Sequence, residues 1–286
     1  MNAAVRWSLW RLRDKHTMRV GIFTAFVTLS VCTAVHAQPI AVRFTEGTMH
    51  GFLVLRSGND ETIAQGELLQ VAHRDRVDSR FVLHFKDGSL YDEKVSFSQR
   101  RVFTMLSYQL VQRGPSFPDT LDASMDRKTG EYQVRARSGT DGPEKLIAGR
   151  LELPPDVYNG MIVTVLRNLA RGENEKVQFV AFMPKPKLIE LELLPVADET
   201  VLVGDQSKHA TQYVLKPQLG SLVHFFGSLL GKLPSDFRYH FWILSEGVPA
   251  FVRFDGPLYL NGPIWRLELL SPQLPESPDS KVLLQK

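Results

Sequence analysis

Residues Leu153–Gly172, LPPDVYNGMIVTVLRNLARG, carry the clearest helical pattern in a chain of 286 residues. Pro154 and Pro155 suit a helix start, because a first turn leaves unpaired the N–H that proline lacks. Gly172 can adopt the left-handed conformation that ends a helix. The apolar residues recur at the spacing of one helical face, and they are Val157, Tyr158, Met161, Ile162, Val165, Leu166 and Leu169. The pattern predicts a helix over about residues 155–171 that packs this face on apolar strands.

The sequence on both sides of this helix is typical of antiparallel β-sheet. Phe81, Leu83 and Phe85 alternate with more polar neighbours, which is the pattern of a half-buried strand. Asp87-Gly88 follows, and this pair supplies the positive φ that a hairpin turn needs. Similar short strands and turns recur before and after the helix. We therefore expect a mainly β protein, with a large antiparallel sheet that curls into a half-barrel or barrel.

A second, shorter helix is predicted near the C-terminal third of the chain. Leu219–Lys232, LGSLVHFFGSLLGK, has helical apolar spacing, although its three glycines weaken a helix. We expect a short helix over about 219–231 that covers an opening of the sheet or lies at a ligand entrance. Residues 38–270 are expected to form a single β-rich domain. The tail 271–286 is rich in Pro and Ser, and we expect it to be disordered.

The most aromatic strand is predicted at Phe237–Leu244, FRYHFWIL. Phe241 and Trp242 fall on opposite faces of that strand, and both faces look buried. If the curled sheet encloses a cavity, the apolar segments around this strand would line it. The same aromatic residues would also suit a filled core. The candidate ligand-binding residues are Phe225, Phe226, Trp242, Phe251 and Trp265.

The N-terminal 37 residues have the features of a secretory signal. Residues 18–37 combine positive charge at Arg19, an apolar run, and Val35-His36-Ala37, a cleavage site with small residues in the right places. The true start is either Met1, with an extended basic region, or Met18. The apolar run is short for a spanning helix. The protein is therefore expected to be periplasmic or otherwise exported, and lipid anchoring at Cys32 is disfavoured because Val31 precedes it.

Charge and motif content exclude several classes of function. The excess of 34 Lys and Arg over 31 Asp and Glu lies in the leader, so the rest of the chain is nearly balanced, which argues against nucleic acid as a partner. The one cysteine also lies in the leader. No H-E-x-x-H, G-x-S-x-G or glycine-rich dinucleotide loop is present, so we expect no metal and no cofactor.

Two segments and the leader resemble a family of bacterial exported proteins of unknown function. The segments are LELPPDVYNGMIVTVLR, Leu151–Arg167, and HFWILSEGVPAFVRFDGPLYLNGPIWRLEL, His240–Leu269. The likeness extends over roughly residues 44–271. It implies export and a β-rich, barrel-like fold, but no activity. Members often carry Asp and Ser where this chain has Asn159 and Gly160.

Three functions are compatible with these observations. The first is a non-enzymatic periplasmic carrier or binder of an apolar ligand, such as a lipid. The second is an envelope assembly or interaction protein with a filled β core that docks another envelope protein. The third is a hydrolase without a recognisable motif, which would need a buried histidine–carboxylate pair beside Ser or Thr in a cleft.

Overall fold

The computed structural model describes residues 39–139, 142–182, 185–203, 206–218 and 239–270. All of them belong to the compact unit that begins at Ala37. Three expected features lie entirely outside the described residues. They are the signal segment 1–37, the second helix at 219–231 and the tail 271–286. No helix within the described ranges has the length and apolar character needed to cross a membrane.

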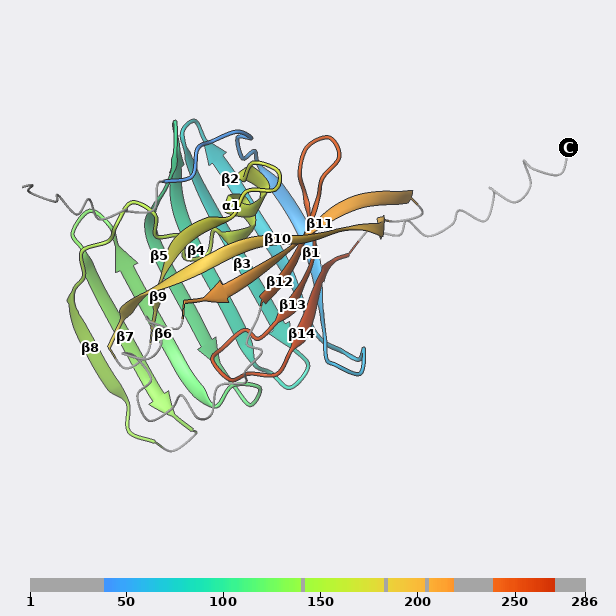
Figure 1. Ribbon diagram of the computed structural model, residues 1–286. Coiled ribbons are helices and arrows are strands. Elements are labelled where there is room, and N and C mark those ends of the chain that lie inside the picture. The colour runs from blue at the N-terminus through green and yellow to red at the C-terminus, as the bar shows by residue number, and fades with distance from the viewer. Residues whose placement is uncertain (1–38, 140–141, 183–184, 204–205, 219–238, 271–286) are drawn as a thin grey trace, which may run out of the picture. The chain divides into compact units, whose positions relative to one another are not determined.

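The described strands form a single antiparallel sheet (Figure 1). Its N-terminal strands are β1 (Met49–Arg56), β2 (Thr62–His73), β3 (Arg76–Phe85), β4 (Leu90–Gln99), β5 (Phe103–Arg113), β6 (Asp119–Asp126), β7 (Glu131–Ser138) and β8 (Lys145–Arg150). Its C-terminal strands are β9 (Glu175–Ala181), β10 (Lys187–Val203), β11 (Gln206–Pro217), β12 (Tyr239–Leu244), β13 (Phe251–Gly256) and β14 (Trp265–Leu269).

The sheet is open, and its order explains how two meanders become one sheet. The strands follow the order β8-β7-β6-β5-β4-β3-β2-β1-β14-β13-β12-β11-β10-β9, so β1 and β14 join the two halves. The edges are β8 and β9. The prediction of a large, curled antiparallel sheet is confirmed in its half-barrel form.

The two halves of the sheet pack against each other across an inner face. In Figure 1, β9–β11 cross over β3–β5. The rings of Tyr108, from β5, and Phe182, just after β9, stack with centroids 5.6 Å apart. The rings of Phe85, from β3, and Trp265, from β14, lie 5.5 Å apart. Apolar side chains from both halves therefore share one core, which is what burying the apolar side of each strand requires.

Alternation along the strands defines the inner and outer faces. On β4, Tyr91, Val95 and Phe97 are buried on the inner face, whereas Lys94 is exposed on the outer face. The predicted turn between β3 and β4 is present, with Gly88 at φ 85° and Asp87 accepting a hydrogen bond from the Ser89 amide. The period-two pattern of the sequence therefore gives the correct faces for this hairpin.

The helix is shorter than the sequence predicts. In place of a helix over about 155–171, α1 spans Ile162–Asn168. The preceding residues pair with the edge strand β9: the Gln178 amide donates to the Asp156 carbonyl (2.9 Å), and the Tyr158 amide donates to the Gln178 carbonyl (3.0 Å). Gly160 then turns the chain at φ 69°. An extended segment that is buried on both sides places apolar residues at positions that also fit a helical period, which explains the overestimate.

The predicted apolar face is nevertheless buried. Val157, Tyr158 and Val165 have no exposed surface, and Met161 and Leu166 retain 1% each. A side chain at Gly160 would approach Val95 and Tyr108 within 3.1–3.3 Å, so the segment lies directly on the inner face of β4 and β5. The Tyr158 hydroxyl accepts a hydrogen bond from the Ile40 amide (2.8 Å). The segment 156–168 thus covers the inner face and joins both halves of the sheet, as the sequence predicts.

Candidate functional site

The structure separates the residues that the sequence proposes as a ligand-binding set. Phe225 and Phe226 lie outside the described residues. Trp265 is on the inner face, where its ring lies 6.3 Å from Phe117 and 6.0 Å from Tyr259. Phe251 is half-buried and packs on the same core.

Trp242 lies on the outer face instead. It pairs in register with Arg253, whose guanidinium lies 3.8 Å from the centre of the indole ring. The indole Nε1 donates a hydrogen bond to Glu199 (3.0 Å). Trp242 is 5% exposed, whereas His240 and Leu244 on the same face are only partly buried, so this face is less buried than the sequence predicts. The Trp242 ring is held by a cation–π contact and a hydrogen bond. Trp242 therefore does not share a site with Trp265.

The inner face carries a carboxyl group that the sequence reasoning passed over. Glu93 follows Tyr91 by two residues on β4 and so shares its inner face. It lies in register between Phe81 of β3 and Leu110 of β5. The Tyr108 hydroxyl donates a hydrogen bond to Glu93 Oε1 (2.7 Å). The sequence could have identified this residue. Glu93 is the one acid in the alternating run Tyr91-x-Glu93-x-Val95-x-Phe97, whose other members are apolar or aromatic.

The Glu93 side chain is half-buried on this face. Phe81, whose ring lies 5.7 Å from Tyr91, is also only partly buried. Both side chains therefore keep part of their surface accessible.

The electrostatics of this site differ from those of an ordinary surface acid. Burial raises the pKa of Glu93, and the nearby phenols of Tyr108 and Tyr91 act in the opposite direction. Burial also raises the pKa of Tyr91 and of Tyr108 well above the usual value, so both phenols stay neutral. No cationic side chain of the described residues pairs with Glu93. We call Tyr91, Glu93 and Tyr108 the inner acidic cluster.

The inner acidic cluster connects to Trp265 through aromatic rings. The Tyr91 ring lies 6.4 Å from Phe117, and Phe117 lies 6.3 Å from Trp265. One of the residues that the sequence proposed is therefore two ring contacts away from Tyr91. The sequence could not show this link, because it depends on the way in which the two halves of the sheet meet.

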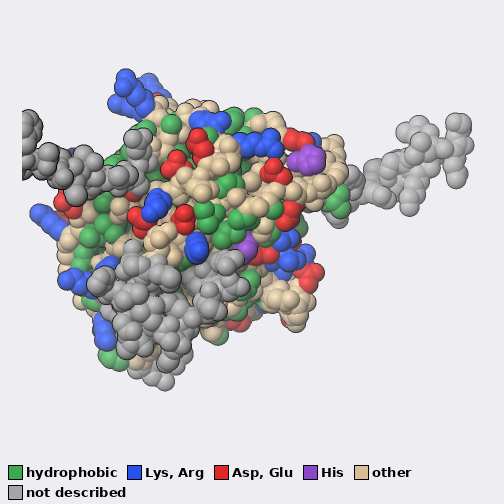
Figure 2. All heavy atoms as spheres, in the orientation of Figure 1, with side chains coloured by type: hydrophobic (Ala, Val, Ile, Leu, Met, Phe, Trp, Pro, Cys, Tyr) green, Lys and Arg blue, Asp and Glu red, His purple; other side chains and the backbone are tan. Residues whose placement is uncertain are grey.

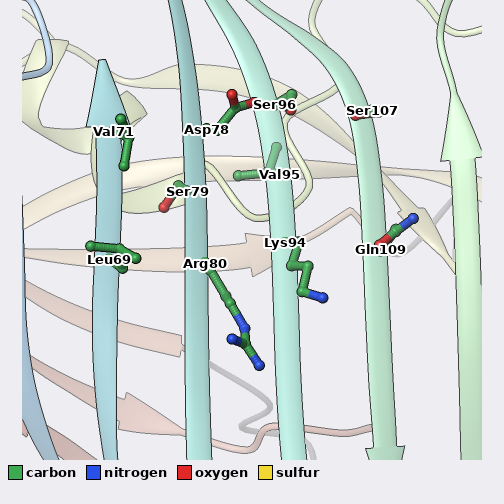
Figure 3. Close-up of a pocket in the computed structure, with 10 residues that line it drawn as sticks. All are labelled: Leu69, Val71, Asp78, Ser79, Arg80, Lys94, Val95, Ser96, Ser107 and Gln109. Carbon is green, nitrogen blue, oxygen red and sulfur yellow. Dashed lines mark hydrogen bonds between the residues drawn. The ribbon is translucent and has the colours of Figure 1, made fainter. Parts of the chain in front are cut away.

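Two open hollows lie on the sheet, and Tyr108 of the inner acidic cluster borders one of them. One, of about 360 Å³, lies over β2–β5 (Figure 3). The other, of about 720 Å³, lies over β5–β8 and shares Ser107 and Gln109 with the first. In Figure 3 the side chains of Arg80 and Lys94 extend side by side from neighbouring strands. These hollows are wide and open to solvent, so they differ from the enclosed sites that hold small molecules.

Ser96 and Asp78 line the first hollow and His73 lies near Asp78, but the three residues are not in a catalytic order. The Ser96 hydroxyl bonds directly to Asp78, and His73 Nε2 lies 3.8 Å from the same carboxylate. A serine nucleophile needs the histidine between itself and the acid. The His73 side chain is also 62% exposed. This arrangement does not supply the buried pair that the hydrolase hypothesis requires.

Other features of the described residues add no reactive centre. No group of three or more His, Cys, Asp or Glu side chains in the described ranges could hold a metal ion. Figure 2 shows acidic and basic side chains interspersed over the face that β9–β11 present. Comparison of the chain with protein-family models, with curated proteins and with solved structures returned no match. The chemistry of the site therefore has to be argued from its own residues.

Proposed function

We propose that this chain is an exported envelope protein that holds an apolar ligand, such as a lipid, against the inner face of its curled sheet. The observation that carries the proposal is the inner acidic cluster, where a half-buried carboxyl group lies on an otherwise apolar face and accepts a hydrogen bond from the Tyr108 hydroxyl. A filled core has no need of such a group, because burying an acid costs free energy. A binding site uses one polar group among apolar ones to orient its ligand.

The open sheet supports this proposal. The inner face offers partly buried apolar side chains from both halves, among them Phe81, Phe182 and Leu188. A ligand could pack on these side chains without unfolding the core. Since the sheet order ends at β8 and β9, its inner face is not sealed by strand pairing.

The experiment is native mass spectrometry of the protein purified from the envelope of its host, followed by thermal shift assays with lipid extracts. We expect a retained apolar molecule and a higher melting temperature when lipid is added. Protein that is repeatedly free of ligand, and whose melting temperature no lipid changes, would contradict the proposal.

A matched pair of substitutions locates the ligand. Ser79→Trp adds bulk to the inner face, because Ser79 pairs with Val95, whereas Ser98→Trp adds the same bulk to the outer face opposite Arg76. The inner substitution should reduce ligand retention and the outer one should not. Equal retention by both variants would place the ligand elsewhere.

A second function, docking of another envelope protein, is favoured by one observation at the β8 edge. β8 pairs only with β7, and Leu146 on it is 58% exposed. Unpaired strand edges can add a strand from another protein. If this function is correct, a stoichiometric partner should copurify and be lost in Leu146→Asp but not in the control Leu202→Asp, whose leucine on β10 is 75% exposed. Retention of the partner by Leu146→Asp would exclude docking at β8.

A further inference from the structure

The β8 edge of the sheet differs from the β9 edge. At β9 the covering segment 156–168 already uses the edge, because the Gln178 amide donates to the Asp156 carbonyl (2.9 Å). Among the described strands β8 pairs with β7 alone, and that pairing has no bulge. β8 also contains no proline. Bulges and prolines are two devices that keep other strands from adding to an edge, so the backbone of β8 is open to a further strand.

The register of β7 and β8 decides which backbone groups of β8 point outward. The amide of Leu151, one residue past β8, donates to the Gly130 carbonyl on the β7 side (2.8 Å). Backbone direction alternates along an antiparallel strand, so every second residue before Leu151 also faces β7. The N–H and C=O groups of Leu146, Ala148 and Arg150 therefore point away from β7, where no described strand pairs with them. The side chains of these three residues share one face of the sheet.

A second copy of β8 satisfies these backbone groups in an antiparallel arrangement. When Ile147 lies opposite its own copy, Leu146 lies opposite Ala148 of the second copy, and Glu144, which precedes β8, lies opposite Arg150. Each of these pairs joins residues with outward backbone groups and side chains on the same face, as an antiparallel ladder requires. Two pairs of opposite charge then flank the two-fold axis at Ile147.

The side chains of these charged residues are accessible to a partner. Glu144 is 47% exposed and lies 3.5 Å from Arg135 and 3.4 Å from Arg137. Arg150 is 76% exposed and lies 3.0 Å from Glu131. Both residues therefore keep free surface next to their pairs within one copy, and a charge from a second copy can add to them.

The charges also select one register. If the copies slide so that Ala148 lies opposite its own copy, Glu144 lies opposite Glu152, and like charges directly opposite each other are destabilising. If they slide the other way, Arg150 lies opposite Gly142 and gains no ion pair. Of these three registers, the one centred on Ile147 alone sets opposite charges against each other.

We propose that the partner at the β8 edge is a second copy of this chain, which adds its own β8 antiparallel about a two-fold axis at Ile147. The inference rests on the second function proposed above, docking at β8, because it names the partner at the same edge. Each copy covers the open edge of the other, so the assembly closes as a dimer and does not extend into fibres. Pairing over so short a strand buries less than a standard interface, so we expect the dimer to dissociate on dilution.

The first test is sedimentation velocity of the full-length protein over a range of concentrations. We expect a concentration-dependent dimer. Glu144→Arg sets two cations opposite each other at both ends of the pairing, and Arg150→Glu sets two acids there. Each variant alone should therefore dimerise about tenfold more weakly or worse.

An equal mixture of these two variants is the matched control. One chain then carries both cations and the other both acids, so opposite charges meet again at both ends. Each variant has also lost an ion pair within its own copy, and mixing does not restore those pairs. We expect the mixture to form a mixed dimer within about twofold of the wild-type affinity. Only pairing between copies accounts for such a recovery.

The second test fixes the register with cysteines. In the proposed pairing Ile147 meets its own copy at a position without ladder hydrogen bonds, where Cα atoms lie about 4.5 Å apart, which suits a disulfide. Ile147→Cys should therefore cross-link two chains under mild oxidation. The control Ala148→Cys should not, because Ala148 lies opposite Leu146. The one native cysteine, Cys32, is the same in both variants.

The outcomes separate self-pairing from docking in general. A monomer at every concentration that copurifies with another envelope protein would overturn self-pairing and leave docking at β8 in place. A monomer without any partner would count against both. A dimer whose variants do not recover on mixing, and in which Ile147→Cys does not cross-link, would place the dimer contact elsewhere. If circular dichroism shows that a charge variant does not fold, the cysteine pair decides alone, and equal cross-linking of Ile147→Cys and Ala148→Cys would overturn the proposed register.

Discussion

Two adjacent acids on β4 experience opposite environments. Asp92 is on the outer face, where Arg80 donates two hydrogen bonds to it (2.9 and 2.8 Å) and Lys94 lies 3.8 Å away. Burial alone would raise the pKa of Asp92, but these cations hold it below its usual value. Glu93, one residue further on, is on the inner face, where none of the described residues gives it a cationic partner, and burial raises its pKa.

The two acids differ in whether neighbouring cations match their charge. An acid whose charge is matched by neighbouring cations needs no further explanation, since surface pairs of this kind are common. An acid that is enclosed without a counter-ion is costly to the fold, and such groups concentrate at functional sites. The contrast between the two faces of β4 therefore singles out Glu93 as the acid whose charge the described residues do not compensate.

The largest effect is expected from removing apolar volume on the inner face. Leu83 and His84 are neighbours on β3 and point to opposite faces; Leu83 has no exposed surface and His84 is exposed. Leu83→Ala should lower the free energy of unfolding by about 2–5 kcal/mol, because it leaves a cavity in the core. His84→Ala should change it by no more than about 0.5 kcal/mol. Urea denaturation measures both, and similar losses would mean that the faces are wrongly assigned.

The next effect compares an enclosed ion pair with an exposed one near α1. Arg167 Nη1 lies 2.6 Å from Glu46 Oε2, and the two side chains are 15% and 2% exposed. Arg171 pairs with Asp198 at 3.0 Å, but both side chains are largely accessible. Arg167→Ala should cost about 1.5–3 kcal/mol, since the buried carboxylate of Glu46 loses its cation and keeps only the hydrogen bond from the Gln70 amide. Arg171→Ala should cost less than about 1 kcal/mol.

Chemical denaturation of these two arginine variants at one pH and one salt concentration provides the measurement. Glu46 Oε1 already lacks a hydrogen-bond partner in the described structure. Loss of Arg167 should therefore lower the free energy of unfolding by more than the contacts of Arg167 alone would suggest. Equal destabilisation by the two variants would show that Glu46 is not enclosed in solution.

The two acids of β4 should also give opposite pH dependence. A raised folded pKa means that the contribution of Glu93 to stability is fully present below its unfolded pKa of about 4 and is lost as the pH rises through its folded pKa. A lowered folded pKa means that the contribution of Asp92 is present above its unfolded pKa and is lost as the pH falls through its folded pKa.

Glu93→Gln and Asp92→Asn make this comparison measurable. Relative to the wild-type protein, Glu93→Gln should become more stable as the pH rises, and Asp92→Asn should become less stable. Urea midpoints at a series of pH values from about 3 to 8 would record both trends. Trends of the same sign would mean that Glu93 and Asp92 do not differ in environment.

The smallest effect is expected at the cation that neutralises the outer acid. The Arg80 side chain is 50% exposed, so its pair with Asp92 is screened by solvent. Arg80→Ala should cost about 0.2–1 kcal/mol, and added salt should reduce that cost. Thermal denaturation at low and high salt would measure it. A loss that is independent of salt would point to packing of the arginine stem instead.

The sequence predicts the sheet well because its signal is local. Alternation at Phe81, Leu83 and Phe85 and the Asp87-Gly88 turn specify a strand, a hairpin and a face without knowledge of the rest of the chain. The helix is predicted less well. Its apolar spacing is right, but Asp156 and Tyr158 give their backbone groups to Gln178 of β9, a partner that no local pattern reveals.

The candidate site depended on contacts between distant strands. Alternation along the strand places Trp242 on the face opposite Phe241. The residues that contact the Trp242 side chain, Arg253 and Glu199, come from two other strands, which the local pattern does not identify. Glu93 was visible as an acid on an apolar face, whereas its partner Tyr108 was identifiable only from the register of β4 and β5. Local sequence thus specifies faces, and the meeting of the two halves decides which residues form a site.

The most direct test of the central claim uses the tryptophans on the two faces. Trp242 and Trp265 report on the outer and inner face, and Trp7 and Trp10 are the same in both variants. The fluorescence of Trp242→Phe and of Trp265→Phe would be followed during titration with lipid extracted from the envelope of the host. If the ligand binds on the inner face, emission should change in Trp242→Phe, which keeps Trp265, and stay constant in Trp265→Phe. A change that survives only in Trp265→Phe, or no change in either variant, would contradict the account.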